Sequence, residues 1–291
     1  MMCRLLQVST SGYYDSLTRP PSEAEKKREI VTQVASEIYK AEYKVPGYRK
    51  IYHQMNHCGV KCSAETVRLV CRRQGILSCV VKRKKRPKTT DSRHHNRVNK
   101  NILNRDFKAE RPNEKWLTDI TYIETKNGFV YLSAIIDLFS RRVIGWCVES
   151  HMRTEMVVET LKRAIDLRGE IPTDLLFHSD RGVQYTSEDF HGCLELLGMT
   201  QSMSEKGQCW DNAPCESFWG KLKAEWLNQR PMFENIDEVR LAVFEYIEGY
   251  YYNTRLHQGL GYRTPREVEE EFFEKSQKNI ENSLTKEIVL C

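Results

Sequence analysis

The sequence predicts an α/β protein, in which a five-stranded mixed sheet with flanking helices is preceded by a small all-α domain. Three observations lead to this prediction. The first hundred residues are strongly basic and show helical periodicity. The chain after Pro112 alternates between β-rich segments and amphipathic helices. Its 291 residues suffice for one full core and a second, smaller domain.

Charge is unevenly distributed along the chain, although the formal net charge is only +5. Residues 1–100 contain 22 Lys and Arg against 8 Asp and Glu, whereas the remainder contains 23 against 32. A basic first third joined to an acidic remainder favours a polyanion-binding arm attached to a second domain. The alternative is a solvated basic face on a helical domain.

The first long helix is predicted to begin after Pro21, because Ser22 can cap it and acidic residues follow in its first turn. It is expected to reach about Tyr43. Its buried face is predicted from apolar residues at intervals of four, namely Ile30, Val34 and Ile38. Residues 1–21 are expected to be a turn-rich linker.

Two shorter helices, at residues 47–56 and 64–74, are predicted on either side of a turn at Gly59. The second of them has an apolar side and a basic side formed by Arg68, Arg72 and Arg73. Such a layout is typical of a helix-turn-helix domain, here residues 22–80, whose second helix enters the DNA major groove. A three-helix bundle without this function is the alternative.

A basic linker is predicted at residues 81–107. It contains five consecutive basic residues, Lys82, Arg83, Lys84, Lys85 and Arg86. Runs of this kind are usually solvated tethers. This run can also lie along DNA phosphates, since each neutralised phosphate releases counterions.

The remaining chain is predicted to form the sheet. Residues 117–123, 128–136 and 142–149 are expected to be three antiparallel strands. They are followed by a helix at 152–168, a strand at 175–177, a helix ending near 197, a strand at 198–202, and helices at 211–227 and 236–252. This order is that of a ribonuclease-H-like core, expected to span residues 108–271 before a tail at 272–291.

Three acids stand out within this core. Asp119 falls in the middle of the first strand, Asp180 directly follows the fourth, and Glu216 lies in the first turns of the helix at 211–227. An aspartate inside an apolar strand is disfavoured by propensity and costly to bury without a cation, which indicates a functional site. Carboxylates suit magnesium, and two such ions can stabilise both oxygens of a phosphoryl displacement. Taken singly, each acid could instead be a helix cap or an ion-pair carboxylate.

The segments WLTDITY (116–122), HSDRGVQY (178–185) and DNAPCESFWGKLK (211–223) resemble the signatures of bacterial insertion-sequence transposases. In particular they resemble the OrfB type of the IS-three family, DDE transposases of the retroviral-integrase superfamily, which also place 35 residues between the last two acids. The resemblance implies an integrase catalytic core that cleaves and transfers DNA strands of an insertion element. It implies that Asp119, Asp180 and Glu216 are catalytic and hold two Mg²⁺ or Mn²⁺ ions.

The resemblance also implies partners for the chain. Lys223 is expected to hold a phosphate of the DNA end. The DNA substrates are the terminal inverted repeats of the element and the target. The protein is expected to act as a homo-oligomer on DNA and as a frameshift fusion with an upstream-frame protein. A cytoplasmic bacterial protein without membrane contact is expected, because its ten cysteines accompany neither a secretory start nor a long apolar run.

Several alternatives remain at this level. A ribonuclease-H-fold nuclease, or a catalytically silent DNA-binding regulator, would share much of the pattern. Asp137 could be a fourth acid or could cap the turn that follows it. His178 could orient a ligand or serve a structural role. Zinc is disfavoured, because the spacing within the quartet His53, His57, Cys58 and Cys62 is too short.

Overall fold

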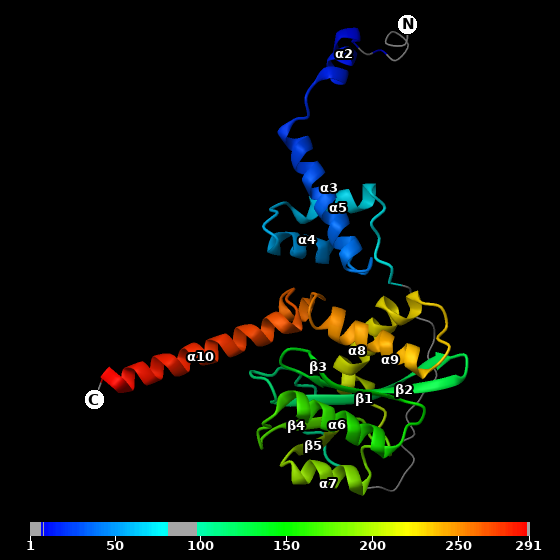
Figure 1. The fold of residues 1–291 in the computed structure, drawn as a ribbon, viewed down its shortest axis with the longest axis vertical. Helices are drawn as coiled ribbons and strands as arrows, with labels where there is room; N and C mark the ends of the chain where they lie inside the picture. The colour runs from blue at the N-terminus through cyan, green and yellow to red at the C-terminus, as the bar shows by residue number, and fades with distance from the viewer. Residues whose placement is uncertain (1–6, 8, 81–97, 290–291) are drawn as a thin grey trace. The chain divides into compact units, whose positions relative to one another are not determined.

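The chain divides into two compact units, within residues 1–78 and 79–291, and Figure 1 draws both as ribbons. The computed structural model describes residue 7, residues 9–80 and residues 98–289. The basic run Lys82–Arg86 lies outside the described residues. Among the helices that are described, none combines the length and apolar character needed to cross a membrane.

The first unit is all-α. Its helices are α2 (Thr10–Thr18), α3 (Glu23–Ala41), α4 (Tyr48–His57) and α5 (Ala64–Arg73). Helix α3 begins at a capping box, in which the Ser22 hydroxyl accepts from the Glu25 backbone and the Glu25 carboxylate accepts from the Ser22 backbone. The three helices α3 to α5 appear as predicted, whereas α2 forms within residues expected to be a linker.

One correction concerns the buried face of α3. Val31, Ala35 and Ile38 form it, whereas Ile30 is 53% exposed and Val34 is only partly buried. Intervals of four and three residues follow the 3.6-residue helical period more closely than two intervals of four. The small side chain of Ala35 was not counted as apolar in the predicted face, yet it is fully buried against the neighbouring helices.

The second unit contains a five-stranded mixed sheet, as predicted. Its strands are β1 (Lys115–Thr125), β2 (Gly128–Asp137), β3 (Val143–Glu149), β4 (Leu176–Ser179) and β5 (Thr200–Met203). The strand order is β3-β2-β1-β4-β5. Strands β1, β2 and β3 are antiparallel, while β4 pairs in parallel with both β1 and β5. Strand β1 is therefore central, between the hairpin partner β2 and the parallel strand β4.

Helices cover both faces of the sheet (Figure 1). Helices α6 (Thr154–Arg168) and α7 (Glu188–Leu196) lie on one face, and α8 (Ala213–Glu225) and α9 (Ile236–Phe244) lie on the other. Gly145 of β3 permits the close approach of α6, because a Cβ there would lie 2.4 Å from the Thr160 carbonyl oxygen. The main core fills the space between the sheet, α6 and α7.

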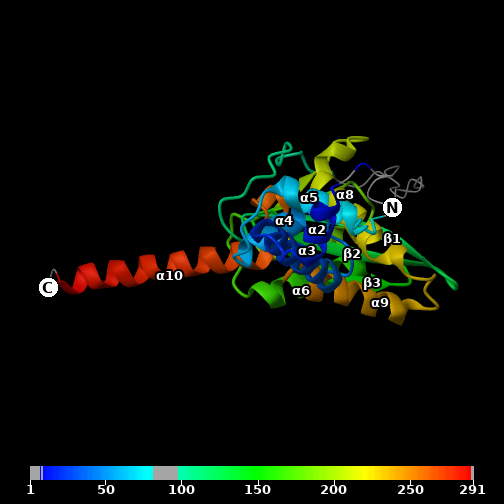
Figure 2. The ribbon, with the colours of Figure 1, turned by 90° about the horizontal axis from the view of Figure 1, so that it is seen from above.

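The region after α8 differs most from the expected pattern. A 3₁₀ turn, η1 (Cys209–Asn212), precedes α8, and another, η2 (Leu227–Gln229), follows it. The single helix expected at 236–252 is α9 followed by a π-helix, η3 (Glu245–Tyr251). After the 3₁₀ turn η4 (Gln258–Leu260), one helix, α10 (Pro265–Val289), continues across the boundary expected at residue 271 (Figure 2).

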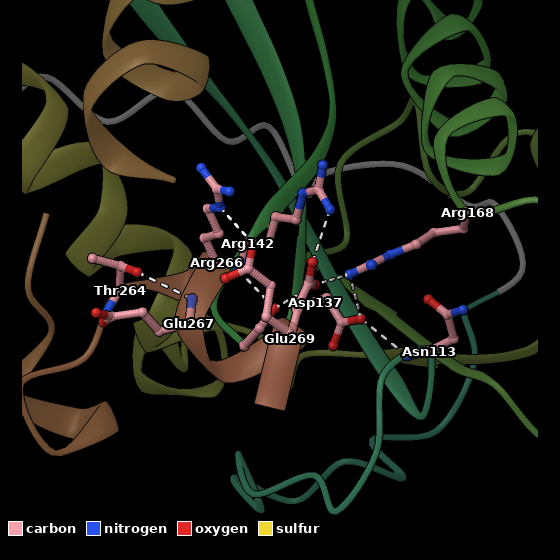
Figure 3. A network of polar contacts seen from close by, with 10 residues as sticks. Asn113, Asp137, Arg142, Arg168, Thr264, Arg266, Glu267 and Glu269 are labelled. Carbon is pink, nitrogen blue, oxygen red and sulfur yellow. Dashed lines mark hydrogen bonds and ion pairs between the residues drawn. The ribbon is translucent and has the colours of Figure 1, made fainter. Parts of the chain in front are cut away.

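A buried charge network joins the base of α10 to the sheet (Figure 3). The Glu269 carboxylate accepts from Arg168 of α6 at 2.6 Å and from Arg142 at 2.8 Å. Arg168 also donates to Asp137 at 2.9 Å. Asp137 accepts from the Phe139 backbone at 2.9 Å, which is the turn-capping role considered for it from sequence. Burial opposes ionisation of Glu269, but the two arginines outweigh this effect and lower its pKa.

Candidate active site

Strand β1 carries Asp119 at the centre of the sheet. Asp119 is opposite Ala134 of β2, and the parallel register with β4 pairs Leu117 with His178. Continuing that register by two residues sets Asp180, directly after β4, beside Asp119. Neighbouring strands are about 4.8 Å apart, so this register makes Asp119 and Asp180 neighbours across the two strands. Both side chains are half-buried.

Helix α8 is attached to β1 along one face. The residues that face the strand, Asn212, Glu216, Trp219 and Lys223, follow intervals of four, three and four, which is the spacing of a single helical stripe. Three of them donate hydrogen bonds to β1, in the same order along the chain: Asn212 Nδ2 to the Thr118 carbonyl (3.1 Å), Trp219 Nε1 to Asp119 Oδ2 (2.9 Å), and Lys223 Nζ to Thr121 Oγ1 (2.7 Å). Glu216 belongs to the same stripe and so faces Asp119.

The electrostatics of Asp119 reflect these neighbours. Burial raises the pKa of its carboxyl group from 3.8 to about 7, and the negative charge of Asp180 adds to this rise. The hydrogen bond from Trp219 opposes the rise by stabilising the ionised form, and Glu216 contributes a further, smaller repulsion. Asp119 therefore interacts electrostatically with both other predicted acids.

The donor set suits a hard divalent cation. Three carboxylates supply the oxygen ligands that Mg²⁺ and Mn²⁺ prefer, and such a cation would relieve the repulsion that raises the pKa of Asp119. Within residues 9–80 and 98–289, no three His, Cys, Asp and Glu side chains are already arranged as ligands of a common ion.

The loop after β4 orients Asp180. The Gly182 backbone N–H donates to Asp180 Oδ1 at 2.9 Å. A Cβ at Gly182 would lie 3.0 Å from that oxygen and 2.9 Å from Gln184 Oε1. Glycine allows this close approach, whereas any larger residue would require the Gln184 or Asp180 side chain to shift.

His178 is a structural residue of the sheet. Its side chain is fully buried, with Nδ1 2.8 Å from the Ser202 hydroxyl and Nε2 3.1 Å from the Ser204 hydroxyl. Burial lowers its pKa to about 4, so the ring is neutral at physiological pH. Of the two roles considered from sequence, these contacts favour the structural one, joining the ends of β4 and β5.

The residues predicted to bind DNA differ from one another in their contacts within the chain. Arg68 makes two hydrogen bonds, of 2.7 and 2.6 Å, to the carboxylate of Glu65 one turn earlier. Arg72 and Arg73 are exposed in the last turn of α5. Lys223 donates to Thr121 and to the Tyr122 carbonyl at 2.7 Å, so it attaches α8 to β1. A phosphate contact by any of these residues stays a prediction.

Sequence reasoning missed two contacts made by α8. One is the hydrogen bond from Trp219 to Asp119, and the other is the buried pair of Arg255 with Glu225 at the end of α8. The first had a signal, because residue 219 is three positions after Glu216 and shares its helical face. The second had none, since Arg255 lies in a segment of irregular structure.

Family models match most of the chain. An HTH-like domain model matches residues 25–86. Two models described as integrase core domain match residues 109–209 and residues 197–265. The two integrase matches together cover β1 to β5, α8 and the segment up to the start of α10.

Curated relatives are similar over nearly their full length. The transposase for insertion sequence element IS904 of Lactococcus lactis subsp. lactis is 34% identical, over 86% of this chain and 98% of the relative. Transposase InsF for insertion sequence IS3A of Escherichia coli is 35% identical, over 92% of each. A solved HTLV-2 integrase catalytic core in complex with magnesium is 18% identical, covering 55% of this chain and 98% of that one, with a TM-score of 0.42. The chain belongs to the family of insertion-sequence transposases that includes InsF, with an integrase core and an HTH-like domain.

Proposed function

We propose that Asp119, Asp180 and Glu216 are the residues with which this transposase cuts and joins DNA strands, and that they hold two Mg²⁺ or Mn²⁺ ions. The observation that carries the proposal is geometric: the parallel register of β1 with β4 runs toward Asp119 and Asp180, and α8, which carries Glu216, is hydrogen-bonded to β1 on both sides of Asp119 and at Asp119 itself. Strand β1, the end of β4 and helix α8 bring these charges together from distant parts of the chain. A buried carboxylate that two others repel is costly to keep ionised unless a cation compensates the charge.

The chemistry is phosphoryl transfer between DNA strands. Water first hydrolyses a phosphodiester at the element end, which leaves a 3′-hydroxyl on one side of the cut and a 5′-phosphate on the other. That 3′-hydroxyl then attacks a second phosphodiester, forms the new P–O bond and displaces the 3′-oxygen of the attacked strand, which leaves as a hydroxyl. Divalent ions, when bound, would lower the pKa of the nucleophile and neutralise charge on the phosphoryl oxygens. Asp119 would hold a cation together with the other two acids, both of which act on its charge. Gly182 would keep Asp180 oriented through its hydrogen bond.

The DNA-binding part of the proposal concerns the first unit and the linker after it. Residues 22–80 would act as the helix-turn-helix-like domain, residues 81–107 as the linker, and residues 108–271 as the catalytic domain. Exposed Arg72 and Arg73 support contacts with phosphate. Assembly as a homo-oligomer on terminal repeats and target DNA, and fusion to an upstream-frame protein, follow from the resemblance.

Asp180→Asn tests the acid assignment. Wild-type protein should gain stability with the logarithm of Mg²⁺ or Mn²⁺ concentration, by about 2.7 kcal/mol at one hundred times the dissociation constant. The variant should lose this gain and all strand cleavage of element-end DNA. In metal-free buffer it should melt at or above the wild-type temperature, because one repulsive charge is gone.

Asp174→Asn is the matched control. Asp174 is an exposed carboxylate of the same unit that forms an ion pair with Arg111. Its replacement should leave both the metal-dependent stabilisation and cleavage in place. Strand cleavage by Asp180→Asn at the wild-type rate would refute the assignment. If the wild-type protein cut the DNA but never joined the ends, the result would favour a nuclease.

A further inference from the structure

Trp219 touches the proposed metal site from behind. Its indole Nε1 donates a hydrogen bond of 2.9 Å to Oδ2 of Asp119. The side chain is 3% exposed, so water does not compete for this donor. Residue 219 lies one helical turn after Glu216, and the hydrogen bond therefore couples the helix that carries one acid to the strand that carries another.

The packing behind the indole restricts its movement. The Phe218 ring lies 4.9 Å from the Trp219 ring and meets Tyr251 of the π-helix edge-on at 5.0 Å. The end of α8, the helix that carries Trp219, is held by Arg255, which makes two hydrogen bonds of 2.6 Å to Glu225. Rotation of the indole away from Asp119 would disturb this buried cluster.

We propose that Trp219 is a positioning residue, which holds one oxygen of the Asp119 carboxylate so that the other is presented to a divalent cation. The inference rests on the proposed function of Asp119. The torsion that orients a carboxylate is broad, so an unrestrained Asp119 would sample many orientations. A fixed orientation reduces the entropy lost when the cation binds. Partners of this kind typically change metal affinity by 10- to 100-fold.

The indole is suited to this task by its chemistry. It is a donor only and carries no charge, so it orients the carboxylate without neutralising it. An arginine or lysine at the same place would cancel the negative charge and compete with the cation. The large apolar ring also excludes water from the side of Asp119 that faces α8.

Trp219→Phe tests the proposal, because it removes the N–H and keeps an aromatic ring. Mn²⁺ is added to the full-length protein without DNA, and free Mn²⁺ is measured by electron paramagnetic resonance. The variant should bind Mn²⁺ about 10- to 100-fold more weakly than wild type. Strand cleavage should recover when the Mn²⁺ concentration is raised by the same factor, which a folding defect would not allow.

Trp226→Phe is the matched control. Trp226 is 5% exposed, ends the same helix and stacks on Tyr250 at 5.8 Å. Its replacement should leave Mn²⁺ affinity within about twofold of wild type, as expected for a contact outside the metal site. Wild-type Mn²⁺ affinity in Trp219→Phe, or an equal loss in both variants, would overturn the role of Trp219.

A measurement on wild-type protein covers the case in which Trp219→Phe does not fold. The chain has five tryptophans, so ¹⁵N-tryptophan labelling should yield five indole signals. Mg²⁺ should shift one of them, and Asp119→Asn should abolish that shift. Absence of any shift would overturn the inference. Equal Mn²⁺ binding by wild type and Asp119→Asn would instead refute the proposed function, which separates the two failures.

Discussion

Arg255 and Glu225 form a buried ion pair, with Nε 2.6 Å from Oε2 and a second guanidinium nitrogen 2.6 Å from Oε1. Their exposed fractions are 4% and 7%. The Tyr246 hydroxyl donates a further hydrogen bond of 2.9 Å to Oε2. The pair connects the segment after the π-helix to the end of the helix that carries Glu216, so the C-terminal part of the chain supports the site.

Arg255→Met should lower the free energy of unfolding by roughly 3–5 kcal/mol, because Glu225 would remain buried without its counter-charge. Urea unfolding followed by tryptophan fluorescence measures this change. All five tryptophans lie between residues 116 and 226, so the signal reports on the second unit alone. The double variant with Glu225→Gln should lose less than the sum of the single variants. An Arg255→Met protein of wild-type stability would contradict the prediction.

Two glycines should respond to alanine in opposite directions. Gly145→Ala should destabilise by about 1–3 kcal/mol or more, because the new Cβ would meet backbone atoms of α6, including the Ala164 nitrogen at 2.9 Å. Gly192→Ala, inside α7 with nothing within 4 Å of the new Cβ, should stabilise by about 0.5–1 kcal/mol. The urea concentrations at the unfolding midpoints of both variants test this prediction. Similar changes at the two sites would show that α6 does not pack tightly against Gly145.

Lys221 should make stability depend on alkaline pH. Burial and the charges of Arg255 and Arg141 together lower the pKa of this half-buried amine to about 8, against an opposing effect of Glu225. Between about pH 8 and its unfolded pKa near 10.4, the unfolded state binds more protons, so stability rises with pH across that window. Below pH 8 the folded state carries the full cost of the charge.

Lys221→Met isolates this effect, because methionine keeps much of the volume and does not titrate. At pH 7 the variant should be more stable than wild type by about 1–2 kcal/mol, a value reduced for partial solvent screening. The difference in unfolding free energy between the variant and wild type should narrow from pH 8 to pH 10. A constant difference in unfolding free energy over this range would argue against a depressed pKa.

Arg72 and Arg73 should contribute to DNA binding through phosphates. Replacing both with glutamine should reduce the slope of log affinity against log salt concentration by up to about 2, with little change in sequence preference. Arg68→Gln is the comparison, and its effect should be smaller because Glu65 already engages that guanidinium. Fluorescence anisotropy with duplex DNA at several salt concentrations measures the slopes, and identical slopes for all variants would exclude this contact.

Local signals in the sequence singled out candidate site residues where residue type conflicts with surroundings. Asp119 was identified because a charged residue is unfavourable inside an apolar strand. Asp180 and Glu216 were singled out by their positions, directly after the fourth strand and in the first turns of the helix at 211–227. The buried face of α3 was predicted in the wrong phase, because two apolar residues stand side by side at 30 and 31 and periodicity alone did not separate them.

The sequence by itself determined the fold class and the order of strands and helices, because these depend on periodicity. It also singled out the three acids as candidates, and their role as a site stays a prediction. Tertiary structure alone decided which partner each side chain meets. Trp219 and Asp119 are 100 residues apart, and Arg142 and Glu269 are 127 apart. No local pattern encodes such pairs, since they arise only when the packing of helices on the sheet brings distant donors and acceptors into hydrogen-bond range.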